Sequence, residues 1–195
     1  MSPIPKRRKM EENKDMYLMG YPIVWNQKTE LYPGYYEQID RNAMQGSDIS
    51  MCALTYNHEG SVMIVAATKN DSLKLTPDSI GLKMVARLSN TTQGRDLYEL
   101  VRGGYLDKMS FAFVLGEEEY DANTKTRTVK KIKTLYDCAV VQVPAYKQSS
   151  VSVMKPEQIV QEQKRRKLSM QLELMDMERE RAIGIYNFER ERGRR

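Results

Sequence analysis

The 195-residue sequence has a single histidine and only two cysteines, and these scarcities restrict the chemistry that is open to it. Cys52 and Cys138 form no CxxC pair, so neither a disulfide framework nor a cysteine-based metal site is expected. No GxxxxGK[ST] or GxGxxG motif is present to bind a phosphate group or a dinucleotide. We therefore expect a protein that uses neither a metal ion nor a cofactor.

Long apolar runs are also missing. No segment approaches the roughly 18 apolar residues that a membrane-spanning helix needs. The basic residues 6–9 are not followed by the apolar stretch of a secretory signal. The sequence therefore predicts a soluble intracellular protein with reduced thiols and no membrane contact.

Positive charge is concentrated at the two ends of the chain, whose net charge is +5. Residues 1–15 hold five basic and three acidic side chains, residues 155–195 hold eleven and eight, and residues 16–154 are neutral overall. A nucleic-acid-binding domain normally carries its basic side chains on the folded part, where they follow the phosphates. We therefore expect a neutral domain with two basic arms, and we consider nucleic acid an improbable partner.

Composition and periodicity divide the chain into three parts. Residues 1–15 are charged and lack periodicity, which predicts a disordered arm. Residues 16–154 hold the apolar and aromatic runs of a folded domain. Residues 155–195 are rich in Gln, Glu, Lys, Arg, Leu and Met, with apolar residues at roughly helical spacing. This tail is expected to be a long amphipathic helix that binds a partner, or else a solvated linker.

Within the domain, the apolar runs mostly favour strands. The segments are 17–25, 51–56, 73–75, 81–88, 109–115 and 135–143, with a possible edge strand at 151–153. Residues 61–68 form a further apolar run, 26–48 are rich in turn residues, and 117–133 form a charged, hairpin-like segment. One helix is predicted between Thr91, a possible N-cap, and the stop signal Gly103–Gly104. The predicted fold class is mostly β with flanking helices (α+β).

Three side chains are candidates for chemistry, and each has a plain structural alternative. His58 follows a buried strand and is the only imidazole in the chain. It is either the group that transfers protons near neutral pH or an ordinary residue of a surface turn. Ser110 lies on the face of its strand that carries small residues, where it is a nucleophile if a base lies close, or a serine bonded to nearby backbone. Asp137, inside an apolar strand, needs a partner, which is either an imidazole or a Lys or Arg side chain.

The ordered set of motifs resembles the prohead maturation proteases of tailed bacteriophages. The resemblance runs from about residue 20 to residue 153 and rests on several segments together. These are Gly-Tyr-Pro-Ile-Val-Trp-Asn at 20–26, Tyr-Pro-Gly-Tyr-Tyr at 32–36, Leu-Thr-Tyr-Asn-His-Glu at 54–59, Gly-Arg-Asp-Leu-Tyr-Glu-Leu-Val-Arg-Gly-Gly at 94–104, Ser-Phe-Ala-Phe at 110–113, Leu-Tyr-Asp at 135–137 and Val-Pro-Ala-Tyr at 143–146.

The resemblance implies a fold and an activity. The family consists of serine endopeptidases similar to herpesvirus assemblins, with a closed, mostly antiparallel β-barrel. They cut the scaffolding part of the capsid protein, and commonly themselves, inside the immature particle in the cytoplasm of the bacterial host. Carried over to this chain, the match implies Ser110 as nucleophile, His58 as base and Asp137 as the third member. The expected partners are the major capsid protein with its scaffolding region and a second copy of the chain.

The sequence departs from the family pattern at three points. Many relatives have Glu where this chain has Asp137. Residues 64–68 lack the arginine that is common there, so any oxyanion support from that arginine must come from elsewhere. Ala112 replaces a common glycine. The competing interpretation is a non-enzymatic β-barrel assembly module whose basic arms bind scaffold or nucleic acid, in which Ser110 and His58 need not be close.

Overall fold

The computed structural model describes residues 16–59 and 64–192. The predicted disordered arm, residues 1–15, lies outside the described residues, as do three residues of the apolar run 61–68. The chain divides into two compact units, one ending at Val153 and the other beginning at Met154. The division into residues 1–15, 16–154 and 155–195 stays a prediction.

The first unit is built mainly of strands, which form two sheets among the described residues. One sheet has the order β10-β1-β7-β6 and is antiparallel throughout. Its strands are β1 (Tyr17–Val24), β6 (Leu73–Pro77), β7 (Gly81–Arg87) and β10 (Ser150–Val153).

The second sheet has the order β2-β3-β9-β4-β5, and β8 pairs with β9 as well. Its strands are β2 (Thr29–Tyr32), β3 (Tyr35–Ile39), β4 (Ala53–Tyr56), β5 (Ala66–Ala67), β8 (Lys108–Asp121) and β9 (Thr126–Val141). Strand β9 is central because it pairs in parallel with β3 and β4 and antiparallel with β8.

The expectation of a closed, mostly antiparallel barrel is wrong for the described part of the chain. The two sheets are bridged by single backbone bonds, such as Ser89 N–H to Val65 O at 2.7 Å and Val151 N–H to Asp107 O at 3.0 Å, and no strand ladder runs between them. At β5 the buried Ser72 hydroxyl contacts the backbone N–H and C=O of Ala67, the groups that a neighbouring strand would otherwise bond. The α+β class with mainly β structure is confirmed.

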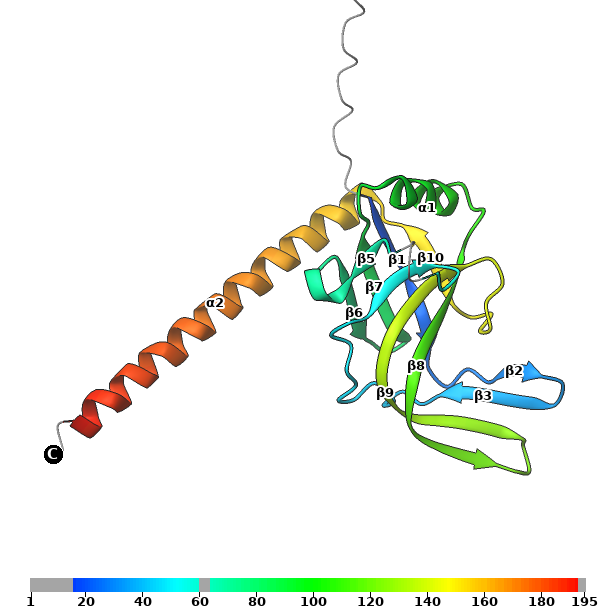
Figure 1. Cartoon of the computed structure of the whole chain (residues 1–195), viewed down its shortest axis with the longest axis horizontal. Helices are drawn as coiled ribbons and strands as arrows, with labels where there is room; N and C mark the ends of the chain where they lie inside the picture. Colours follow the sequence, from blue (N-terminus) through cyan, green and yellow to red (C-terminus); the bar gives the residue numbers. More distant parts are fainter. Residues whose placement is uncertain (1–15, 60–63, 193–195) are drawn as a thin grey trace, which may run out of the picture. The chain divides into compact units, whose positions relative to one another are not determined.

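The longest strands differ from the prediction. The charged segment 117–133 does not separate two short strands but forms the outer part of one hairpin, in which β8 and β9 pair from Lys108–Val141 to Asp121–Thr126. Figure 1 shows the two arrows running side by side beyond the rest of the sheet, next to β2 and β3. In this outer part β8 is exposed on both faces from Gly116 onward, whereas β9 buries Val129 and Ile132, three residues apart, so neither strand shows a regular apolar alternation. The β2–β3 hairpin was also missed, because its strands are only four and five residues long and flank the turn residues Pro33 and Gly34.

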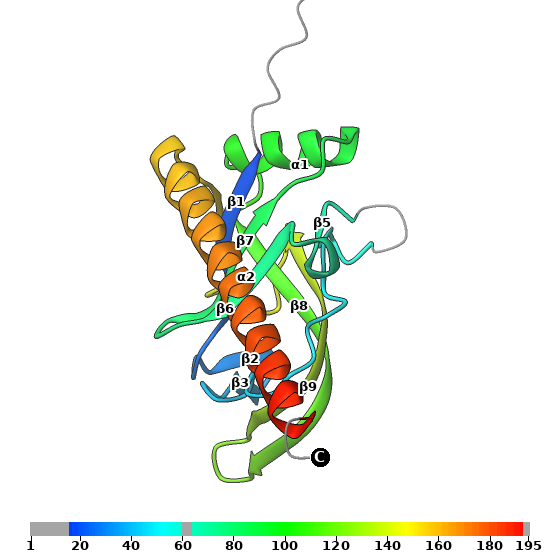
Figure 2. The ribbon, with the colours of Figure 1, turned by 90° about the vertical axis from the view of Figure 1, so that its left-hand side faces the viewer.

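Helix α1 (Thr92–Arg102) is the predicted helix, with the predicted ends. The Thr91 hydroxyl accepts a hydrogen bond from Gly94 N–H at 3.1 Å, and Gly103 N–H bonds to Glu99 O. Gly104 follows at φ +74°, a conformation that favours glycine. Leu97 and Val101 are buried in the core. The helix lies across the end of β1 and β7, as seen from the side in Figure 2.

The second unit is one long helix, α2 (Pro156–Arg192). Its apolar side chains Leu168, Leu172 and Met175 are exposed, and so are Met170, Leu174 and Met177. At 100° per residue these two groups lie on opposite sides of the helix. No helix among the described residues is long and apolar enough to cross a membrane.

Candidate active site

His58 and Asp137 lie in direct contact. Their Nδ1 and Oδ2 atoms are 2.6 Å apart. A carboxylate only accepts hydrogen bonds, so Nδ1 carries the proton, and a neutral imidazole then has an unprotonated Nε2. Of the two partners left open for Asp137 by the sequence, an imidazole or a cationic side chain, the structure has the imidazole. The His58 ring is 36% exposed, whereas the Asp137 side chain is 12% exposed.

The end of β4 explains how His58 reaches Asp137. Asn57 N–H donates to Val140 O at 3.0 Å, which extends the pairing of β4 with β9 by one residue. A turn closed by Glu59 N–H to Tyr56 O at 3.0 Å then reverses the chain. Both Asn57 (φ +48°) and His58 (φ +62°) are left-handed, which costs about 1–3 kcal/mol for each such residue. The hydrogen bond between His58 and Asp137 and the extended ladder offset this cost and hold the imidazole next to β9.

Thr55 is a site residue that sequence reasoning missed. Its hydroxyl donates to Asp137 Oδ1 at 2.9 Å, so both carboxylate oxygens have a partner. Thr55 is 1% exposed. The only signal in the sequence is its place three residues before His58 in a buried strand, and the pairing of β4 with β9 is needed to recognise it. A carboxylate with two partners is held in one orientation, and it holds the imidazole in turn.

Ser110 lies on the same face of the sheet as this pair. Ser110 of β8 is opposite Ala139 of β9, and Ala139 is in turn opposite Thr55 of β4. Directly opposed residues of neighbouring strands share a face, and so do residues two apart along one strand, such as Asp137 and Ala139. The small Ala139 therefore lies between the serine and the threonine. Among the described residues no hydrogen bond joins Ser110 to His58.

The opposite face of the same strands belongs to the core. The predicted alternation of β8 is confirmed, because Met109 and Phe111 are buried, whereas Ser110 and Ala112 are half-buried. Cys138 points away from Asp137 into the core, as predicted, with its Sγ 4.0 Å from that of Cys52. The hydrogen bond with Cys52 and complete burial raise the pKa of the Cys138 thiol, so it stays protonated and unreactive. It plays no part in the site.

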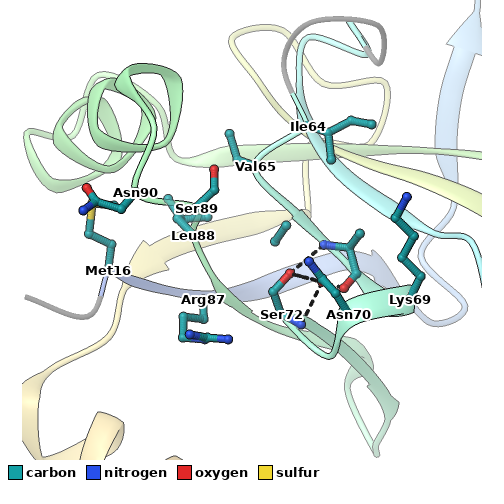
Figure 3. A pocket seen from close by; sticks show the side chains of 12 residues that line it. Met16, Ile64, Val65, Lys69, Asn70, Ser72, Arg87, Leu88, Ser89 and Asn90 are labelled. Atoms are coloured by element: carbon teal, nitrogen blue, oxygen red, sulfur yellow. Dashed lines mark hydrogen bonds between the residues drawn. The ribbon is translucent and has the colours of Figure 1, made fainter. Parts of the chain in front are cut away.

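A pocket of about 290 Å³ lies between β5 and the end of β7 (Figure 3). Its lining includes Val65, Ser72, Arg87 and Ser89, and none of Ser110, His58 and Asp137. The candidate site residues therefore do not lie in this cavity. No group of three or more metal-binding side chains occurs in the part of the chain that the structure describes.

An imidazole held by a carboxylate, on the same face as a serine with small neighbours, is the arrangement found in serine hydrolases. The sequence agrees with this class, because residues 4–165 match the family of the caudovirus prohead serine proteases. This match covers most of the chain, which therefore belongs to that family and is, at the level of the family, a serine protease of the phage prohead. No curated protein matches the chain.

Proposed function

We propose that this protein is an endopeptidase in which Ser110 is the nucleophile, His58 the general base and Asp137 the residue that orients His58. The observation that carries the proposal is the contact between His58 Nδ1 and Asp137 Oδ2 at 2.6 Å, because it leaves Nε2 as the proton acceptor. The register that sets Ser110 and Asp137 on one face supports it further.

The reaction is acyl transfer in two steps. Ser110 Oγ attacks the carbonyl carbon of the scissile peptide bond while its proton passes to His58 Nε2. The C–N bond then breaks, and the imidazolium gives this proton to the leaving amine. In the second step His58 takes a proton from water, the hydroxide attacks the acyl group, and the Ser110 hydroxyl is restored. Asp137 stabilises the imidazolium in both steps, and Thr55 keeps its carboxylate in place.

We further propose that the substrate is the scaffolding part of the major capsid protein, and this chain itself, within the immature particle in the host cytoplasm. Membership in the prohead protease family supports this choice of substrate. A polypeptide bound in extended form is chemically suited to the surface beside Ser110 and Ala112, because these two side chains are small and half-buried and leave room for a backbone to approach.

The proposal is tested first without a known substrate. A fluorophosphonate transfers its phosphonyl group to an activated serine oxygen as fluoride leaves, and intact mass reports one adduct per chain. We expect labelling of the wild type at Ser110, and none in Ser110→Ala or His58→Ala. Circular dichroism should show both variants folded, because each side chain is at least partly exposed.

The second test uses the purified capsid protein of the same phage, with its scaffolding segment, as substrate. Fragments that form with the wild type and not with Ser110→Ala support the proposal. A folded wild type that neither acquires an adduct nor produces fragments would instead leave a non-enzymatic assembly module as the function.

A further inference from the structure

Residues 144–149, within the segment that joins β9 to β10, run along the outer edge of β8 and are called the strap below. It contains the Pro-Ala-Tyr motif of the sequence, to which the mechanism gives no task. The strap ends where Val151 N–H donates to Asp107 O at 3.0 Å, just before β8 begins. It therefore lies beside the first residues of β8, which include Ser110.

Ser149 connects the strap to the residue before the nucleophile. Its hydroxyl lies 2.6 Å from Met109 O and 2.8 Å from Tyr146 O, two acceptors that share its one proton, and it accepts from Met109 N–H at 3.1 Å. Ser149 is 1% exposed. One side chain thus satisfies both backbone groups that Met109 turns away from β9, a role that a neighbouring strand normally has.

Tyr146 anchors the other end of the strap. Its ring lies 5.1 Å from that of Phe111, and its hydroxyl donates to the buried carboxylate of Glu37, which Arg127 also contacts at 3.0 Å. Burial and the Glu37 bond raise the pKa of the Tyr146 hydroxyl, so the donor stays protonated. The strap is therefore fixed to β3 and to β8 at once.

Successive residues of β8 are bonded on opposite edges of the strand, Met109 by Ser149 of the strap and Ser110 by β9. Backbone groups alternate in direction along a strand, so Ser110, which follows Met109, turns its own N–H and C=O towards Ala139 of β9. On the basis of the proposed function, we propose that Ser149 is a positioning residue for catalysis. By bonding both backbone groups of Met109, it sets where β8 presents the Ser110 hydroxyl to His58.

The test compares Ser149→Ala with a matched control, Ser72→Ala. Ser72 is also buried, and its hydroxyl accepts from Ala67 N–H at 2.8 Å and lies 3.3 Å from Ala67 O (Figure 3). Ala67 lies on β5, which β4 and β9 separate from β8. The Ser72 hydroxyl also donates to Asn70 Oδ1 at 2.6 Å. Both variants therefore remove a buried hydroxyl that bonds a strand edge, and only Ser149→Ala removes it beside Ser110.

The readout is phosphonylation of the full-length protein by the fluorophosphonate, resolved into a limiting rate constant and a half-saturating concentration. Misplacement of a reacting group by about 1 Å costs about 100-fold in rate. We expect Ser149→Ala to lower the limiting rate about 10- to 100-fold with unchanged half-saturation, and Ser72→Ala to leave both unchanged. Ser149→Thr, which keeps the hydroxyl, should restore most of the rate. Amide exchange at Met109 should quicken in Ser149→Ala alone.

The outcomes separate this role from the proposed function. A wild type that is never labelled at Ser110 defeats the proposed function. A labelled wild type that Ser149→Ala matches in limiting rate defeats the positioning role, and so does an equal loss in Ser72→Ala. If Ser149→Ala unfolds at the assay temperature, Ser149→Cys replaces it, because its thiol is a weaker partner of similar size. An intermediate rate in Ser149→Cys then supports the role, and a wild-type rate overturns it.

Discussion

Replacing Asp137 by asparagine and by alanine tests how the imidazole is held. Asp137 accepts from His58 on one oxygen and from the Thr55 hydroxyl on the other. An amide has one oxygen and one NH₂ group, so it accepts on one side only. A hydroxyl, however, can also accept. In Asp137→Asn the amide NH₂ therefore turns to Thr55, its oxygen stays on His58 Nδ1–H, and the reactive tautomer is kept.

The expected loss in Asp137→Asn is then the missing negative charge. Two unit charges about 4 Å apart near a protein surface interact by about 4 kcal/mol, or roughly a thousandfold in rate. Solvent at the partly exposed His58 screens part of this, so we expect the limiting rate of phosphonylation to fall about 100-fold. Asp137→Ala also removes the group that orients the His58 imidazole, so we expect its limiting rate of phosphonylation to fall about 10⁴-fold.

Thr55 determines whether Asp137→Asn loses less rate than Asp137→Ala, so replacing Thr55 tests this explanation. In a Thr55→Val background the amide NH₂ has no acceptor on that side, so it turns to His58 Nδ1 and stabilises the unreactive tautomer. The advantage of asparagine over alanine should then vanish. Rates measured for the four Asp137 variants, Asn and Ala with either residue at position 55, decide the question. If asparagine is no better than alanine beside Thr55, or keeps its advantage beside valine, this account of the site is wrong.

Three further predictions concern the fold. Burial, and then the bond to Asp78 at 2.7 Å, raise the pKa of Tyr21 to about 12. The unfolded chain therefore loses this proton first, and urea unfolding of the wild type should show a stability loss above about pH 10 that Tyr21→Phe lacks. Thr91→Ala removes the N-cap of α1 and should cost about 1 kcal/mol in thermal unfolding. Gly20→Ala would place its Cβ 2.0 Å from Ser150 O, so we expect a loss of at least about 1–3 kcal/mol by the same measurement.

Local signals predicted the parts of the fold that local physics controls. Thr91 and Gly104 mark the ends of α1 because capping and left-handed backbone depend on one or two residues. The small side chain at Ala112 and the bulky one at Phe111 marked the two faces of β8, because alternation has a period of two. The outer part of the β8–β9 hairpin gave no such signal, since β8 is exposed on both faces there and β9 buries Val129 and Ile132 at a spacing of three rather than two. Closure into a barrel came from the family resemblance alone and is absent from the described strands.

The candidate site was harder to predict because it depends on register between distant strands. The pairing skips Tyr136, because Ala112 faces Asp137 and Phe113 faces Leu135. This bulge lets Leu135 point into the core while Asp137 points to the opposite face, although regular alternation would put the two on one face. Without the bulge, a strand that buries Leu135 would bury Asp137 among apolar side chains, away from His58.

The same dependence explains why Thr55 and Ser149 escaped notice. Each acts on a residue more than 35 positions away, Thr55 on Asp137 and Ser149 on Met109, and neither belongs to a residue pattern with a known spacing. Serine and threonine are common, and only the geometry of their partners distinguishes a structural hydroxyl from one that supports a reaction. His58 and Ser110 could be proposed as base and nucleophile because the chain has one histidine and because the family resemblance singled out this serine. The hydroxyls of Thr55 and Ser149 could not be proposed in this way. Strand pairing, and not composition, determines which of the many serines and threonines lie beside the site.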